Sequence, residues 1–419
     1  MSANRRAGRG DVLDVIVVGA GVVGAAAALA FARDGLRVAL VESREPPPWR
    51  AEAPDLRVYA FAPDNAALLD DLGVWTSVRA ARSQPYRAMR VWDAGGGGEL
   101  VFDADRLARP ELGWIVEHGL LVDRLWSALP AAGVQLHCPA RVVGLEQDDD
   151  GATLEVAQEQ AEDVHAARPR RLRARLVIAA DGADSQLRAL AGIEAPRHDY
   201  HQRGLVAFVE HAAPHQATCW QRFLPSGPLA FLPFVMSDIE CEADGGTTRS
   251  SIVWTLPDDE AARLLAVDDA AFLIELERAF DGPLGPMLAV SKRAAFPLRR
   301  QLARSQVAGR VAVVGDAAHV VHPLAGQGVN LGLRDVAALR ATLADTIRRG
   351  GDPGRPARLQ RWARQCRSDN AVAAFTLEGL NRLFSNDALA PTLLRGPLLG
   401  LAGRLPPLTA ALWRHAAGL

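Results

Sequence analysis

The fold is decided by residues 12 to 43, which read VLDVIVVGAGVVGAAAALAFARDGLRVALVES. The β-branched run at 12–18 predicts a buried strand, the alanine-rich run at 22–34 a helix, and 37–41 a second strand. A strand, a glycine turn, a helix and a strand within about 30 residues form a βαβ unit, which has a right-handed crossover and a parallel sheet. The sequence therefore predicts a Rossmann-like α/β domain at the start of the chain.

The glycines of the turn follow the spacing G-x-G-x-x-G, at Gly19, Gly21 and Gly24. The first permits a tight turn, the second lets a pyrophosphate approach the backbone, and the third lets the helix pack on the strand. Glu42 ends the second strand, where a carboxylate can accept hydrogen bonds from ribose hydroxyls, and Arg44 follows it. We predict that these five residues bind a dinucleotide, and the motif alone does not separate FAD from NAD.

Length and composition limit the class of protein. A chain of 419 residues holds two or three structural units at about 150 residues per domain. The formal net charge of -2 provides no field to hold a nucleic-acid backbone, so nucleic acid is not an expected partner. The four cysteines form no C-x-x-C pair, which argues against a disulfide framework or a zinc ribbon and favours the cytoplasm.

Further along the chain, the patterns predict a helix at 121–132, strands at 134–145 and 172–180, and a second sheet after Pro196. The strand pattern of the first domain returns at 310–315, so we expect the second domain to be inserted in the first. The expected domains are a first domain of 11–80, 104–195 and 300–345, a sheet-rich domain of 81–103 and 196–299, and a helical C-terminal region of 346–419.

Two more motifs follow in order. One is ADGADSQLR at 180–188, and the other is GDAAH at 315–319, which continues as HPLAGQGVNLGLRDV at 322–336. With the first glycine motif, they make the sequence resemble the FAD-dependent aromatic-ring hydroxylases, the single-component flavin monooxygenases. The resemblance implies a para-hydroxybenzoate hydroxylase-like fold, in which a Rossmann-like FAD-binding domain carries an inserted mixed-sheet substrate domain.

The resemblance also implies a set of site residues. Asp181 and Gly182 would lie at the FAD pyrophosphate, and Gly315 and Asp316 would hold the ribitol. The segment Gly326, Gln327, Gly328, Val329 and Asn330 leads into a helix whose N-H groups would face the flavin. Arg57 and His118 match positions beside the flavin, where relatives often carry Asn or Arg in place of His118. Pro323 would lie beside the reactive edge of the ring, and we add His322, with Arg57 and Pro323, as candidate catalytic residues.

A closer resemblance is carried by DLRVYAFAPDNAALLDDLGVW at 55–75, LGWIVEH at 112–118 and LFSNDALAPTLLRGPLLGLAGRLPPL at 383–408. These segments look like the ubiquinone-biosynthesis hydroxylases. That family implies that NAD(P)H reduces FAD, that O2 adds at flavin C4a to give a hydroperoxide, and that this species hydroxylates a polyprenylated phenol or benzoquinol. The ring carbon, the prenyl length, the catalytic base and the oligomeric state stay open.

A polyprenyl tail has to be received at a membrane or from a protein partner. From Ala388 to Leu419 the only formal charges are three arginines, so this tail either rests on the inner membrane face or packs on the domain. Other ubiquinone-biosynthesis proteins are the expected protein partners.

Two alternative functions stay open. In the first, the protein hydroxylates a soluble aromatic or polyketide substrate; in the second, it is a FAD-bound subunit without catalysis. The pair His319 and His322 invites a metal interpretation, but no third ligand follows at a suitable spacing, so we predict no metal.

Overall fold

The computed structural model describes residues 12–95, 98–158, 169–235, 248–321, 328–366 and 413–414. The first sheet is built around β1 (Leu13–Val18), which is almost entirely buried because neighbouring elements cover both faces. β1 pairs in parallel with β2 (Val38–Val41) and with β11 (Arg170–Ala179). The strand order is β18-β19-β11-β1-β2-β8, and β9 and β10 form an antiparallel layer that continues from β11. The other strands of this sheet are β8 (Gln135–His137), β9 (Ala140–Gln147), β10 (Ala152–Gln158), β18 (Val307–Ala308) and β19 (Val311–Val313).

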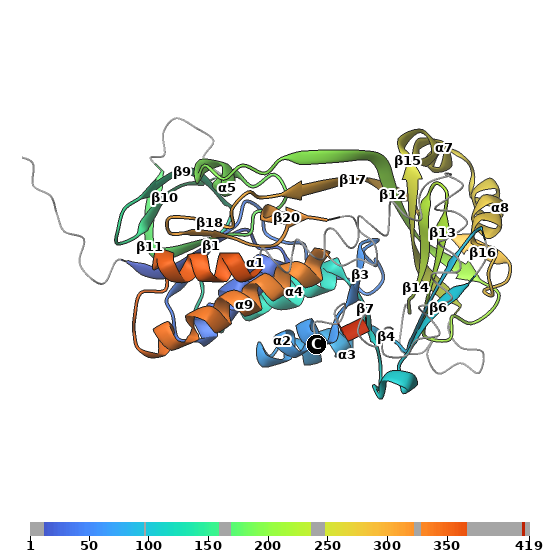
Figure 1. Ribbon diagram of the computed structural model, residues 1–419, viewed down its shortest axis with the longest axis horizontal. Helices are drawn as coiled ribbons and strands as arrows, with labels where there is room; N and C mark the ends of the chain where they lie inside the picture. The colour runs from blue at the N-terminus through green and yellow to red at the C-terminus, as the bar shows by residue number, and fades with distance from the viewer. Residues whose placement is uncertain are drawn as a thin grey trace, which may run out of the picture.

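Three helices cover one face of this sheet, as Figure 1 shows: α1 (Val22–Arg33), α4 (His118–Ala128) and α9 (Gly328–Arg348). α1 packs between α4 and α9, and the side chains of Ala25–Ala28 are fully buried. Small side chains let both neighbours approach the helix closely, which accounts for the alanine-rich sequence. The short helix α5 (Gln186–Leu190) packs against β9.

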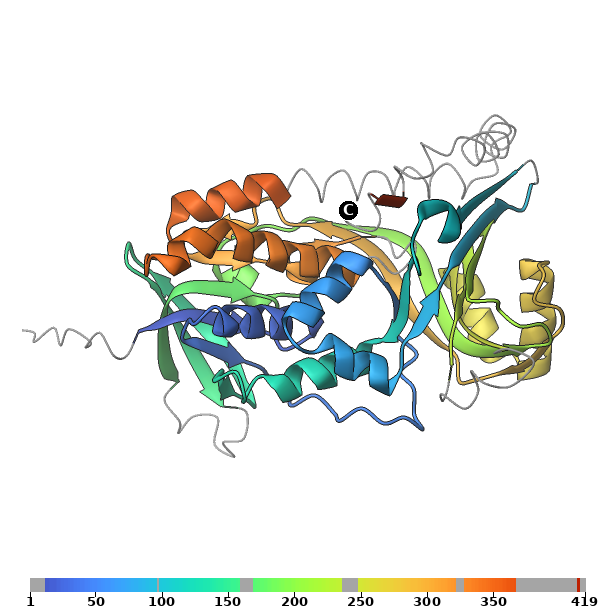
Figure 2. The ribbon, with the colours of Figure 1, turned by 90° about the horizontal axis from the view of Figure 1, so that it is seen from below.

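A second sheet has the order β20-β17-β12-β15-β14-β13-β5-β6, with β16 beside β12. Its outer face is covered by α7 (Asp258–Ala266) and α8 (Asp269–Phe280). The long strands β12 and β17 run from the region of the first sheet into the second, so the two sheets are joined by continuous strands (Figures 1 and 2). The strands are β5 (Ala88–Asp93), β6 (Glu99–Asp103), β12 (Arg197–His211), β13 (Thr218–Leu224), β14 (Gly227–Pro233), β15 (Arg249–Pro257), β16 (Met287–Val290), β17 (Ala294–Leu302) and β20 (His319–Val320).

A small third sheet lies between the other two (Figure 1). It has the order β3-β7-β4, formed by β3 (Val58–Phe61), β7 (Gly113–Glu117) and β4 (Gln84–Tyr86). The short helices α2 (Pro63–Asp71) and α3 (Trp75–Ala81) follow β3, and the 3-10 turns are η1 (Asp105–Leu107) and η2 (Gly315–Ala317). This small sheet brings residues 57–61 and 113–118 against the region between the larger sheets.

The structure corrects three expected boundaries. The strand expected at 134–145 is divided into β8 and β9 at Cys138–Pro139, because proline cannot donate to the ladder. α4 begins and ends earlier than the predicted 121–132, and it stops at Ala128 because Pro130 has no N-H to donate to the carbonyl of Trp126. α9 begins at Gly328, inside the segment 326–330 expected to precede the helix.

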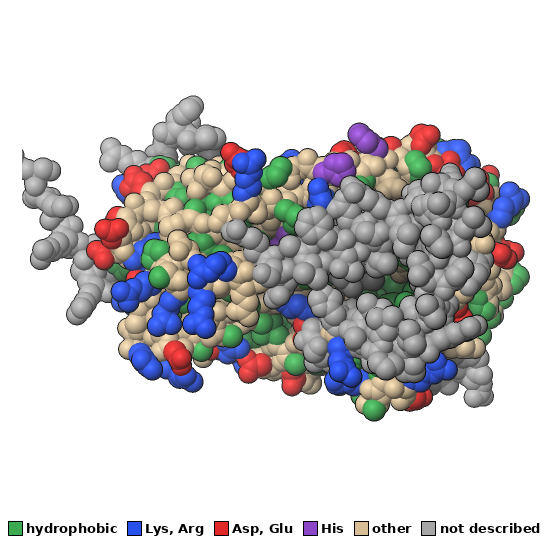
Figure 3. Space-filling view, viewed as in Figure 1, with side chains coloured by type: hydrophobic (Ala, Val, Ile, Leu, Met, Phe, Trp, Pro, Cys, Tyr) green, Lys and Arg blue, Asp and Glu red, His purple; other side chains and the backbone are tan. Residues whose placement is uncertain are grey.

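In the part of the chain described, no helix is both long and apolar enough to cross a membrane. The face in Figure 3 carries acidic and basic side chains around its rim, in keeping with the small net charge of -2.

Candidate active site

A cavity of about 560 Å³ lies where the first, second and third sheets meet. It is lined by the start of α1, by β3, by the start of α4, by the turn after β19 and by the inner face of the second sheet. Its polar lining includes Arg57, Tyr59, His118, Arg299 and Asp316. Predicted residues that are far apart in the sequence therefore reach one cavity.

The glycine turn forms one end of this cavity. Gly19 has φ +99°, and a Cβ there would lie 2.4 Å from the carbonyl oxygen of Ala180. A Cβ at Gly24 would lie 2.0 Å from the carbonyl oxygen of Gly19. By contrast, a Cβ at Gly21 would have open space, and Gly21 is the N-cap of α1. The first and third glycines thus serve packing, and the middle glycine keeps the N-terminus of α1 open.

Glu42 lies against the same turn. Its carboxylate accepts a hydrogen bond of 2.6 Å from the N-H of Ala20, and its other oxygen accepts bonds from the Ser43 hydroxyl and the Arg44 N-H. The acid at the end of β2 is therefore oriented by backbone donors, whereas the Arg44 side chain is exposed.

The Asp-Gly motif follows β11 on the other side of the turn. The Asp181 carboxylate accepts hydrogen bonds from the Ser185 hydroxyl and, at 3.1 Å, from the Leu187 N-H, so it orders the start of α5. Gly182 has φ +80° and open space around its Cα. The structure places this turn beside Gly19 through the backbone of residues 180 and 181.

Gly315 and Asp316 follow β19 at the floor of the cavity. Gly315 has φ +59°, and its N-H donates to Asp335 at 3.0 Å. The Asp316 carboxylate faces the cavity, where the surrounding protein displaces water and raises its pKa against the lowering effect of His319, Arg57 and Arg299. A carboxylate directed into the cavity can accept hydrogen bonds from a polyol.

α9 begins at this floor. Gly328 and Val329 line the cavity. Asn330 is buried, and its side chain donates to the Ala60 carbonyl and accepts from the Ala62 N-H and from Asn65. The side chain of Asn330 thus ties α9 to the segment after β3. The predicted residues His322, Pro323, Gly326 and Gln327 lie outside the described residues.

Arg57, Tyr59 and His118 form the wall supplied by the third sheet. The Tyr59 hydroxyl lies 2.8 Å from Nδ1 of His118, and the two rings meet edge to face. Burial, assisted by the charge of Arg57, lowers the pKa of His118 to about 4, so the imidazole is neutral at pH 7. Neutral His118 and exposed Arg57 thus present one hydrogen-bonding ring and one positive charge to the cavity.

Comparison with known proteins identifies the chain. Residues 12–369 match the model of a family described as FAD binding domain. The chain belongs to this FAD-binding family. It is 38% identical over 410 residues to a ubiquinone hydroxylase from Rhodospirillum rubrum, a match that covers 97% of this chain and 90% of that protein. It is 35% identical to the 3-demethoxyubiquinol 3-hydroxylase of Escherichia coli, covering 97% and 98% of the two chains. The protein is an FAD-dependent monooxygenase.

Solved structures of the FAD-dependent monooxygenases share the fold. The chain matches the p-nitrophenol 4-monooxygenase of Pseudomonas putida with a TM-score of 0.74, 20% identity and 96% coverage of both chains. It matches the anhydrotetracycline hydroxylase of Streptomyces rimosus with a TM-score of 0.68 and 21% identity, covering 97% of this chain and 76% of that one. The predicted fold, a Rossmann-like FAD-binding domain with an inserted mixed sheet, is thereby confirmed.

Two supports of the monooxygenase site were not predicted from the sequence. Buried Glu117 accepts hydrogen bonds from Arg82, from the Trp49 indole and from the Asp55 N-H, and so fixes the segment that leads to Arg57. The signal was present in the motif LGWIVEH, where an acid directly precedes His118 at the end of an apolar strand.

The second support is the buried pair of His319 and Asp335, in which Nε2 lies 2.6 Å from a carboxylate oxygen. Burial alone would lower the pKa of His319, but the Asp335 carboxylate outweighs that effect and raises it. Because the same oxygen accepts from the Gly315 N-H, this pair holds the turn that presents Asp316. Both residues lie within quoted motifs, but only the fold brings them together.

Proposed function

We propose that this monooxygenase hydroxylates the ring of a polyprenylated phenol or benzoquinol in ubiquinone biosynthesis, with NAD(P)H and O2 as co-substrates. The observation that carries the proposal is the similarity, over 97% of the chain, to two proteins named as a ubiquinone hydroxylase and a demethoxyubiquinol hydroxylase. The cavity supports it, because the inner face of the second sheet gives it a mainly apolar wall.

The residues present fit FAD. A Cβ at Gly21 has open space above the N-terminus of α1, where a pyrophosphate can approach free N-H groups. We assign Gly19, Gly21 and Gly24 to the pyrophosphate turn, Glu42 to the adenosine ribose and Asp316 to the ribitol, whose hydroxyls would pair with a carboxylate that faces the cavity. Gly328 and Val329 line the cavity, and Gly182 and Gly315 directly precede its lining residues Ala183 and Asp316. Arg44, Asp181, Gly326, Gln327 and Asn330, the remaining predicted contacts, stay part of the same assignment.

Bound FAD supplies the chemistry, since it accepts a hydride from NAD(P)H and activates O2 for transfer of one oxygen atom. The chain's own residues orient the substrate and enclose the cavity. Arg57 offers a positive charge and His118 a neutral ring beside the cavity. The apolar wall excludes water, which would otherwise divert the activated oxygen to hydrogen peroxide. Pro323 and His322 remain proposed catalytic residues.

The prenyl tail requires contact with a membrane or a lipid-carrying partner, so we propose peripheral attachment. In the C-terminal tail the structure describes Trp413, which is buried among residues of the second and third sheets and is stacked against Arg109. Trp413 therefore contacts the protein, and residues 388–412 and 415–419 lie outside the described residues. We keep the three-part division of the chain given above as part of the proposal.

Mass spectrometry of products tests the function. The FAD-loaded enzyme receives NADPH or NADH, O2 and short-chain prenylated phenols and quinols in detergent, and the position of the new oxygen on the ring is determined. We expect one hydroxylated prenylated product for one reduced nicotinamide consumed. Turnover only with an unprenylated phenol or polyketide would transfer the assignment to a soluble substrate, and FAD binding without any product would leave a non-catalytic subunit.

A further inference from the structure

The inner face of the second sheet carries a nearly continuous apolar row. Cross-strand pairing aligns Ala230 of β14 with Val253 of β15, and Val253 with Val206 of β12. All three line the cavity. These three side chains provide area and shape for an aromatic ring, but none of them can distinguish one edge of the ring from another.

Gln221 of β13 stands in the same row. Its cross-strand neighbours are Ala230 on one side and Val91 on the other, so neither offers a polar partner. Gln221 is 9% exposed and lines the cavity. Throughout the described ranges, its side-chain amide makes no hydrogen bond to protein, in contrast to Gln301, whose amide donates to Ala183 at 2.7 Å.

Because the Gln221 amide opens into the cavity and has no partner among the described residues, the group that completes its hydrogen bonds is solvent or a ligand in that cavity. Ala230, directly opposite, carries only a methyl group and offers the amide no hydrogen bond from its side chain. The other polar side chains of the second sheet that line the cavity are engaged elsewhere or carry a single polar group: Arg299 pairs with Asp184, and Thr255, Cys219 and Trp220 carry a hydroxyl, a thiol and an indole N-H.

We propose that Gln221 binds an oxygen substituent of the aromatic substrate and thereby fixes which ring carbon is presented for hydroxylation. This inference rests on the proposed function and deepens it. An amide both donates and accepts, so it can donate to a methoxy or carbonyl oxygen or accept from a phenolic hydroxyl. It is also uncharged, which suits a neutral phenol, quinol or methoxylated ring better than a ring that carries a carboxylate.

The test is Gln221→Met, which keeps the length of the side chain and removes the amide. With the FAD-loaded full-length enzyme and a short-chain prenylated quinol, we expect KM to rise about tenfold, the value of one hydrogen bond. We also expect less hydroxylated product per NAD(P)H consumed, and a second ring position among the products. FAD affinity and melting temperature should be unchanged, because the amide makes no hydrogen bond to the described part of the protein and Gln221 does not belong to the glycine turn.

A matched control is Gln202→Met on β12 in the same sheet. Its amide donates to the Ser226 carbonyl and does not line the cavity, so KM and ring position should stay those of the wild type. A substrate pair gives a second measurement. Wild type should prefer the ring that bears the oxygen substituent over the ring that lacks it by about tenfold, and Gln221→Met should show no preference. If Gln221→Met does not fold, Gln221→Asn, which withdraws the amide by one methylene, takes its place.

The two hypotheses fail differently. Wild-type enzyme that hydroxylates prenylated rings, together with a Gln221→Met variant of unchanged KM, coupling and ring position, overturns the role of Gln221 and leaves the proposed function standing. Wild-type enzyme that yields no hydroxylated prenylated product overturns the proposed function and this substrate assignment with it.

Discussion

Gly21 and Gly24 lie in the same turn, yet the space around them differs. A Cβ at Gly24 would overlap the carbonyl oxygen of Gly19, whereas a Cβ at Gly21 would meet nothing within 4 Å. Gly21 also has φ -63°, which any residue adopts. Gly24 is therefore required by packing, and a requirement for glycine at position 21 has to come from a ligand.

Gly24→Ala and Gly21→Ala separate these two roles. Gly24→Ala should destabilise the apoprotein by about 1–3 kcal/mol, since overpacking forces the turn and helix apart. Gly21→Ala should leave the unfolding free energy of the apoprotein within about 1 kcal/mol of wild type. It should nevertheless weaken FAD binding about tenfold or more, which corresponds to at least about 1.4 kcal/mol. Urea unfolding and FAD titration by fluorescence measure the two quantities, and equal FAD affinity of Gly21→Ala and wild type would contradict the assignment.

His118 leads to a pH-dependent stability. Its pKa is about 4 in the folded protein against 6.5 for the free side chain, because burial disfavours the charged ring. The unfolded chain therefore takes up a proton first as the pH falls, and stability is lost between pH 6.5 and pH 4. Above pH 6.5 both states hold a neutral ring, and this residue contributes no slope.

His118→Gln should remove part of that slope. After allowance for the partial exposure of the ring, we expect the variant to lose about 1–2 kcal/mol less than wild type between the two pH values. His215→Gln is the matched control for a buried histidine away from the cavity. Burial also lowers the pKa of His215 to about 4, and His215 does not line the cavity. Denaturant unfolding at a series of pH values checks this, and parallel curves for wild type and His118→Gln would show that the ring is not held neutral.

Among the elements, α9 is fixed at its start by a buried amide side chain. Asn330 makes hydrogen bonds with Ala60, Ala62 and Asn65, so the start of the helix is joined to the segment between β3 and α2. Gly332 adds a close approach, since a Cβ there would lie 2.6 Å from Val23 of α1. The position of α9 therefore follows from polar and steric contacts rather than from helix propensity.

Asn330→Ala should destabilise the protein by about 2–4 kcal/mol, because it leaves several buried donors and acceptors without partners. Asn65→Ala should cost less, and the double variant should be less destabilised than the sum of the singles by about 1 kcal/mol. Unfolding free energies of the four proteins give this coupling. Strict additivity would mean that the two amides act independently.

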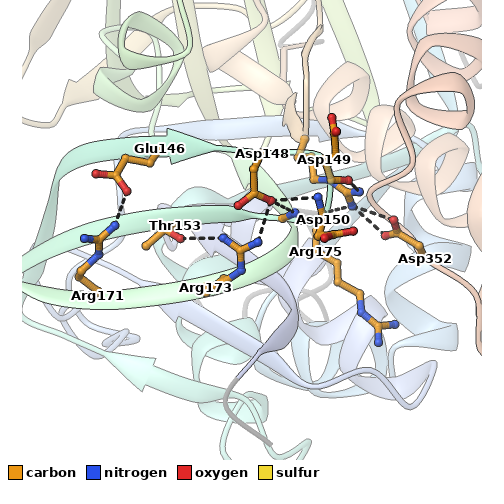
Figure 4. Close-up of polar contacts among 11 residues, drawn as sticks. Glu146, Asp148, Asp149, Asp150, Thr153, Arg171, Arg173, Arg175 and Asp352 are labelled. Atoms are coloured by element: carbon orange, nitrogen blue, oxygen red, sulfur yellow. Dashed lines mark hydrogen bonds and ion pairs between the residues drawn. The ribbon is translucent and has the colours of Figure 1, made fainter. Parts of the chain in front are cut away.

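At the scale of the whole molecule, Arg310 joins segments that are distant in sequence. Its buried guanidinium contacts the Asp352 carboxylate at 2.8 Å, the Arg175 carbonyl at 3.1 Å and the Asp149 carbonyl. Figure 4 shows Asp149, Arg175 and Asp352 brought to one place at the end of the β9–β10 turn, with Arg171 and Glu146 paired further along these strands. The loop after α9 is thereby held against the first sheet.

Removal of Arg310 and removal of Arg171 should lower the free energy of unfolding by unequal amounts. Arg310→Met should cost about 3 kcal/mol, since it breaks a buried pair and frees two carbonyls. Arg171→Met removes an ion pair whose side chains are 56% and 64% exposed, and should cost less than about 1 kcal/mol. Thermal unfolding at low and high salt compares them. Losses of similar size would contradict the view that burial decides the contribution.

The sequence by itself determined the βαβ start, the glycine turn with Glu42 and the order of the motifs, because these depend on local spacing and on the hydrophobic period. Motif resemblance also predicted that Arg57, His118 and Asp316 belong to one site, and the structure brings all three to one cavity. Local pattern misplaced the division between β8 and β9, since a proline can interrupt an apolar run whose period continues across it.

Only the tertiary structure decided which polar groups are already satisfied. The side chain of Asn330, predicted as a cofactor contact, makes its hydrogen bonds to the protein. Gln221, which no motif contains, lines the cavity and has no hydrogen-bond partner among the residues that the structure describes. The difference arises from cross-strand register and from packing between segments hundreds of residues apart, such as the 268 positions between Ala62 and Asn330. Spacing along a chain carries no record of such neighbours, so the cavity and its supports appear only once the sheets are assembled.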